Sequence, residues 1–142
     1  MLVSQILKSK GDLVFTVIPS ETVAEVAALL HSRRVGALVV LDAESVVGIV
    51  SERDIVRAMA ADGAAALARP VSAYMTADVF FAQPGETVDQ LLAHMTDRRI
   101  RHLPVCKGER LVGIVSIGDL VKFKISEVEA EADGLKAYIA AG

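Results

Sequence analysis

The stretch Val47-Gly48-Ile49-Val50-Ser51, followed by Asp54, decides the fold because the chain contains it twice. It recurs as Val112-Gly113-Ile114-Val115-Ser116, followed by Asp119, at an offset of 65 residues. Around it, 42 consecutive residues align at this offset without a gap, and 17 of them are identical. A unit of this length is too long for a solenoid repeat and too short for an ordinary independent domain. The duplication therefore predicts two similar halves that share one core.

Composition limits the class of protein. The chain has 142 residues, of which 53% are hydrophobic and 23% charged, so one compact domain with a sizeable core is expected. The formal net charge of −3 disfavours a broad nucleic-acid interface. The single cysteine, Cys106, permits no internal disulfide and no cysteine-type metal site, and as a counterpart of Leu41 it is expected to be a buried, inert thiol. No stretch resembles a signal peptide or a membrane span, so a soluble, cytoplasmic protein is expected.

Local patterns predict the same elements in both copies. Thr22 with Glu25, and Thr87 with Gln90, form capping-box patterns that open helices, and the helices should end near residues 34 and 99. Short apolar runs then predict two hairpins, with strands at 37–41, 46–50, 102–106 and 111–115. The fold class is therefore mixed α/β: two β-α-β-β-α units about a pseudo-twofold axis, with boundaries at 1–68 and 69–126, and a further helix in the tail 127–142.

The pair Ser51 and Asp54, repeated as Ser116 and Asp119, follows a predicted buried strand in each copy. Serine is a preferred helix N-cap, and an aspartate in the first turn is favoured by the helix dipole. The same arrangement offers N–H groups to an anion, and its carboxylate can accept hydrogen bonds from a ribose diol. Both interpretations are open, because a cap can also face a cleft.

The repeated unit resembles a cystathionine-β-synthase (CBS) domain, and the whole chain resembles a stand-alone tandem pair of such domains, a Bateman module of the bacterial type. The signature run stands as Gly48-Ile49-Val50-Ser51-Glu52-Arg53-Asp54 and as Gly113-Ile114-Val115-Ser116-Ile117-Gly118-Asp119. The resemblance covers about residues 1–125. It implies a regulatory module that binds AMP, ADP, ATP, NAD or S-adenosylmethionine in two clefts between the repeats, with no catalytic cofactor.

The resemblance also implies which residues would hold the ligand. Asp54 and Asp119 would bind ribose, and Ser51 and Ser116 would lie near ribose or phosphate. Adenine would meet backbone and apolar groups of the opposite repeat. Asp119 is accordingly paired with Val14, Phe15, Val35, Gly36 and Ala37. Asp54 is paired with Val79, Phe80, Ile100, Arg101 and His102.

The two clefts are expected to differ. The Asp54 cleft would be cationic, since Arg53, Arg101, His102 and Arg57 could all contribute, and it should favour phosphate-bearing ligands. Gly36-Ala37 would admit an adenine ring more easily than the bulky Arg101-His102. Structural roles remain open for three of the basic residues near the second helix end, Arg98, Arg99 and His102. His31 and His94 do not recur and are expected at the surface or an interface.

The sequence contains no catalytic constellation, metal motif or phosphate-binding loop, so we expect no enzyme activity. The predicted function is an adenine-nucleotide sensor that acts on a separate effector protein by population shift, as a homodimer. The alternative is a dimerising scaffold with empty or vestigial clefts. A nucleic-acid-binding module is a weaker third possibility, given the acidic balance.

Overall fold

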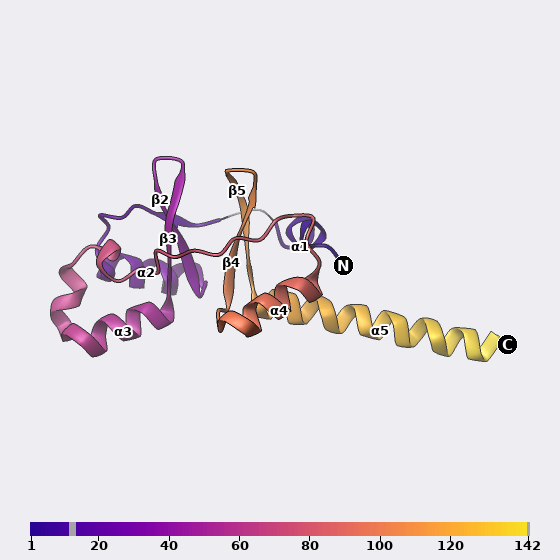
Figure 1. Ribbon diagram of the computed structural model, residues 1–142. Coiled ribbons are helices and arrows are strands. Elements are labelled where there is room, and N and C mark those ends of the chain that lie inside the picture. The colour runs from indigo at the N-terminus through magenta and orange to yellow at the C-terminus, as the bar shows by residue number, and fades with distance from the viewer. Residues whose placement is uncertain (12–13, 142) are drawn as a thin grey trace. The chain divides into compact units, whose positions relative to one another are not determined.

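The computed structural model describes residues 1–11 and 14–141 (Figure 1). These residues form two compact units that cut across the sequence repeats. The first unit contains residues 1–11, 81–108 and 112–141, and the second contains residues 14–80 with 109–111. The repeat boundaries at 1–68 and 69–126 stay a prediction about sequence, since the units describe packing.

The second unit holds the first copy of the repeated stretch in the expected order. Its elements are β1 (Thr16–Val17), α2 (Val23–Arg33), β2 (Ala37–Asp42), β3 (Ser45–Ser51) and α3 (Glu52–Asp62). They form a three-stranded sheet of order β1-β2-β3, in which β1 and β2 are parallel and β2 and β3 antiparallel. Two 3₁₀ turns follow, η1 (Gly63–Ala68) and η2 (Val71–Ala73). Gly63, with a φ of 61°, ends α3 before these turns.

The first unit holds the second copy. Its elements are α1 (Val3–Lys10), α4 (Val88–Arg98), β4 (His102–Lys107), most of β5 (Arg110–Ser116) and α5 (Ile117–Ala141). The strands β4 and β5 pair in a two-stranded sheet. Both first helices of the repeats start at the expected capping boxes, with Thr22 accepting from the Glu25 N–H and Thr87 from the Gln90 N–H, each at 3.1 Å. The mixed α/β class is thus confirmed.

The leading strand of the second copy is shorter than expected. Only an isolated parallel bridge, Ala82 with Val105, stands where Val17 pairs with Val40 in the first copy. The Ala82 N–H donates to the Pro104 carbonyl, so the next bond of a parallel ladder would need an N–H on Pro104 itself. Proline has none, and the ladder ends there.

The C-terminal segment also differs from the expectation of a separate tail helix. The structure shows one uninterrupted helix of 25 residues, α5, which continues well past α4 (Figure 1). Glycine in a helix interior costs only about 1 kcal/mol relative to alanine, so Gly134 does not stop it. Residues 127–141 are thus the continuation of the helix that begins after Ser116.

Most of the buried apolar side chains among the described residues belong to two clusters, one in each unit, and the single core expected from the repeat stays a prediction. The segments that precede the repeats are exchanged between these clusters. Leu7, before the first repeat, packs in the cluster of the second, whereas Val71 and Met75, before the second repeat, pack in that of the first. Each leading segment therefore completes the unit that contains the other copy.

The glycines of the repeated stretch make room for these exchanged segments. A Cβ on Gly48 would lie 2.5 Å from the Met75 sulfur and 3.1 Å from the Thr76 carbonyl oxygen. A Cβ on Gly113 would lie 2.5 Å from a Leu7 methyl carbon. The backbone of Thr76 is tied to the neighbouring strand residue Ile49 by two hydrogen bonds of 2.9 Å, so it cannot withdraw easily.

We expect Gly48→Ala to lower the free energy of unfolding by about 1–3 kcal/mol, because the added methyl group overpacks the contact with Met75 and Thr76. Urea denaturation followed by circular dichroism measures the change. Gly85→Ala is the control, since a Cβ there meets nothing within 4 Å. Equal stability of the two variants would show that Gly48 is not needed for close approach.

Candidate functional site

The repeated Ser-x-x-Asp pair lies where the last strand of each copy meets a helix. Ser51 ends β3 and caps α3, and its backbone N–H donates to Oδ2 of Asp54 at 2.9 Å. Ser116 ends β5 before α5, and its N–H donates to Oδ2 of Asp119, also at 2.9 Å. The Asp54 and Asp119 N–H groups return to the serine Oγ atoms at 3.4 and 3.1 Å. Both carboxylates are therefore held in one geometry by reciprocal capping.

The loop after the first helix of each copy is fixed against the same junction. The Glu52 N–H donates to the Gly36 carbonyl at 3.0 Å, and the equivalent Ile117 N–H donates to the Arg101 carbonyl at 2.8 Å. The chain reaches these positions through a left-handed residue in each copy, Arg34 (φ 54°) and Arg99 (φ 53°). The expected adenine-side residues 35–37 and 100–102 thus adjoin the Ser-x-x-Asp pair of their own repeat.

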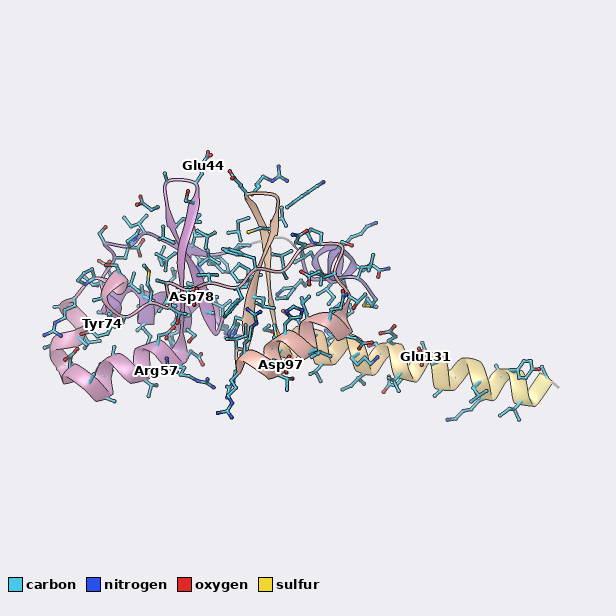
Figure 2. All side chains as sticks on the ribbon, viewed as in Figure 1. Glu44, Arg57, Tyr74, Asp78, Asp97 and Glu131 are labelled. Atoms are coloured by element: carbon cyan, nitrogen blue, oxygen red, sulfur yellow. The ribbon has the colours of Figure 1, made fainter. Side chains whose placement is uncertain are left out.

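In the first copy the carboxylate has a neutral third partner. Asp54 is only 5% exposed, and Thr76 Oγ1 donates to its Oδ1 at 3.3 Å. Ser51 Oγ also lies 3.1 Å from Oδ2. The guanidinium of Arg57 is 3.8 Å from Oδ1, but this side chain is largely exposed on α3 (Figure 2), so water screens the pair. Apart from this screened pair, the partners of Asp54 are neutral donors.

In the second copy an ammonium group takes the equivalent place. Lys10 Nζ, at the end of α1, lies 2.6 Å from Oδ2 of Asp119 and 2.9 Å from the Ile114 carbonyl oxygen. Burial raises the pKa of Asp119, but the hydrogen bonds and charge of Lys10, with the bonds from Ser116, outweigh it and leave the pKa below its usual value. The two half-sites thus share a geometry and differ in charge.

An open hollow lies beside the first half-site, at the end of α2. It has a volume of about 710 Å³ and is lined by Leu30, His31, Ser32, Arg34, Val35, Gly36 and Glu52. Binding sites for small molecules commonly have volumes of about 300–1,000 Å³. Two of the expected adenine-side residues, Val35 and Gly36, therefore line a hollow of suitable size, and exposed His31 stands at its wall.

The other expected site residues are distributed over both units. Arg53 is exposed on α3, and Arg101 is exposed beside β4. Val14 and Phe15 are half-buried, with Phe15 under the Arg33 guanidinium at 4.9 Å from the ring centre. Ala37 is buried, Val79, Ile100 and His102 are half-buried, and Phe80 is 39% exposed. The pairing of each aspartate with residues of the opposite repeat stays a prediction.

Sequence reasoning missed Lys10 and Thr76. Both lie in segments that precede a repeat and pack on the unit holding the other copy, so no local pattern connects them with Asp119 or Asp54. The weak similarity of Val3-Ser4 to Val71-Ser72 was the available signal that these segments are equivalent. Cys106 is a free, buried thiol as expected, and burial raises its pKa.

No helix in the described part of the chain combines the length and apolar character that a membrane span requires. Comparison with solved structures supports the fold. The CBS-domain protein ATU1752 from Agrobacterium tumefaciens is 46% identical, with a TM-score of 0.86 over 87% of this chain and 99% of its own. The CBS domain pair of protein MJ0100, in complex with 5′-methylthioadenosine and S-adenosyl-L-methionine, is 26% identical, with a TM-score of 0.80 over 89% and 98% of the two chains.

Comparison of sequences leads to the same family. The CBS-domain-containing protein CBSX3, mitochondrial, of Arabidopsis thaliana is 33% identical over 149 aligned residues, which cover 99% of this chain and 72% of the relative. The profile of the CBS domain matches twice, at residues 11–61 and 71–126, and each match includes one copy of the Ser-x-x-Asp pair. With two matches that span most of its length, the chain belongs to the CBS-domain family.

Proposed function

We propose that this CBS pair is a regulatory module that binds an adenosine-containing ligand through Asp54 and Asp119 and acts, without catalysis, on a separate effector protein in a reducing compartment such as the cytoplasm. The observation that carries the proposal is the identical capping of both carboxylates by Ser51 and Ser116. A carboxylate held in this way presents fixed acceptors to the two adjacent hydroxyls of a ribose. The ligands of MJ0100, 5′-methylthioadenosine and S-adenosyl-L-methionine, both carry such a ribose.

The proposed ligand classes are AMP, ADP, ATP, NAD and S-adenosylmethionine. The hollow at the end of α2 supports an adenine ring, since it has apolar walls at Leu30 and Val35 and an open backbone at Gly36. The sequence pairs Val35 and Gly36 with Asp119. The second half-site supports an anionic group near Asp119, because Lys10 supplies an ammonium there. Regulation would follow from differential affinity: a ligand that binds one arrangement of the module better shifts the population toward it.

We expect titration calorimetry with AMP, ATP, NAD and S-adenosylmethionine to detect binding of at least one of them. Asp54→Asn and Asp119→Asn should each weaken the affinity at the affected site about tenfold or more, because the charged acceptor of the ribose hydroxyls is lost. Asparagine keeps an oxygen for the serine N–H, so the cap and the fold should remain.

Asp97→Asn is the matched control, since Asp97 lies exposed on α4 (Figure 2) and belongs to neither Ser-x-x-Asp pair. Unchanged affinity in both site variants would overturn the assignment of the ribose carboxylates. Absence of binding for all four ligands by the folded wild-type protein would contradict the proposal and favour the scaffold.

The charge of Lys10 should set ligand preference at the second half-site. We expect Lys10→Met to weaken AMP binding about tenfold, to change 5′-methylthioadenosine binding little and to strengthen S-adenosylmethionine binding, because a cation attracts phosphate and repels a sulfonium. Calorimetry with the three ligands measures the order. Lys8→Met, an exposed change on the same helix, is the control. Equal losses for all three ligands would mean that Lys10 only holds Asp119 in position.

A further inference from the structure

The outer part of α5 carries a continuous apolar stripe. Six residues form it, and we name it the α5 stripe: Val121, Ile125, Val128, Ala132, Leu135 and Ile139. The Ile125, Val128, Leu135 and Ile139 side chains are 54%, 50%, 61% and 67% exposed, and every residue from 128 to 141 is exposed. Figure 2 shows the side chains around Glu131 and beyond projecting from a helix with no other element alongside in its unit. The stripe thus has no cover among the described residues.

The spacing of the α5 stripe is that of a coiled coil. Successive members lie 4, 3, 4, 3 and 4 residues apart, which averages close to 3.5 residues and keeps the stripe on one side of two supercoiled helices. Ile125, Ala132 and Ile139 occupy the a positions, and Val121, Val128 and Leu135 the d positions. A groove in a globular partner would not require this alternation, whereas a second helix with the same repeat does.

We propose that the α5 stripe pairs with the α5 stripe of a second copy of this chain in a parallel two-stranded coiled coil. Isoleucine at a positions with leucine at a d position favours two strands. The charged residues on either side of the stripe favour one relative orientation of the two helices. In a parallel pair each g residue faces the e residue five positions later in the other helix. Lys124 then meets Glu129 of the second copy, and Glu131 meets Lys136, so both pairs are of opposite charge.

An antiparallel pair with the stripes fully overlapped brings like charges together. Residues of the same flank then face each other about the centre of the stripe, so Glu129 and Glu131 each lie opposite their own copies and Lys122 opposite Lys136. Like charges at these positions are unfavourable. Shifting the helices to pair Glu129 with Lys136 leaves only four of the six apolar positions in contact. The parallel register alone uses the whole stripe with complementary charges.

The N-terminal part of α5 packs within its own chain, so the outer part provides most of the surface for the proposed pairing. Leu120 is buried and Phe123 packs against the core of its own unit, while Lys124 lies 3.1 Å from Asp89 on α4. Lys124 is therefore already paired with Asp89 of its own chain. The layers from Val128 to Ile139, with Glu131 and Lys136, remain for the second copy, and they lie beyond the end of α4 (Figure 1).

Disulfide trapping tests the pairing directly. We expect Ile139→Cys to form a covalent dimer under mild oxidation at micromolar concentration, because parallel a positions face each other at the same residue number. Adding Leu135→Glu should abolish the cross-link, and adding Ala137→Glu, the same charge on the opposite face of the helix, should not. Wild-type protein, whose Cys106 is buried, shows the background. No cross-link, or one insensitive to Leu135→Glu, overturns the proposal.

A charge exchange tests the orientation. Lys136→Glu should weaken the dimer about tenfold in sedimentation equilibrium, because two attractive pairs become repulsive. Glu131→Lys in the same chain should restore it if the helices are parallel. Restoration by Glu129→Lys instead would establish the shifted antiparallel pair and overturn the parallel register. None of these residues belongs to the proposed nucleotide half-sites, so the variants leave the proposed ligand contacts in place.

Discussion

The capping of an aspartate by the serine three residues before it is the interaction on which the structure of both half-sites depends. A carboxylate withdrawn from water needs donors, and the serine N–H at the end of β3 or β5 supplies one at 2.9 Å in each copy. The same bond joins the last strand to the following helix, whose N-terminus favours negative charge. At each junction the fold and the candidate site therefore depend on the same contact.

Because that contact is the same in both copies, the two half-sites differ in the third partner of each carboxylate. Thr76 offers a hydroxyl to Asp54, which leaves the charge in place. Lys10 offers an ammonium to Asp119 at 2.6 Å, which compensates the charge and lowers the pKa of the carboxyl against the opposing effect of burial. The close partners of Asp54 are therefore neutral donors, whereas Asp119 is in a close ion pair. The duplication conserves the frame, while the segments before the repeats make the two sites unequal.

The sequence was sufficient for whatever is encoded locally. The capping boxes at Thr22 and Thr87, the hairpins and the serine–aspartate pairs all follow from residues close together in the chain. The exchange of the segments that precede the repeats could not be predicted from local patterns. Leu7 and Met75 present similar apolar groups, and each could fill the space over Gly48 or Gly113. Pattern alone does not choose between equivalent partners in the two copies. The contact of Lys10 with Asp119 was missed for that reason. Prediction of the shortened strand at Ala82 would have required knowing which hydrogen bond Pro104 would have to donate.

The length of α5 gives the two half-sites different access to the α5 stripe. The helix begins beside Ser116, carries Asp119 in its first turn, and is fixed to its unit by Leu120 and Phe123. A helix of this length spans about 37 Å, so a small tilt at its start becomes a much larger displacement at Ile139. A ligand bound at Asp119 as proposed would act on the same helix that bears the stripe. Asp54 belongs to the other unit and lies on a different helix, α3. Coupling between ligand and dimer should therefore be stronger for the half-site that holds Lys10, and by linkage dimerisation should change the affinity of that site most.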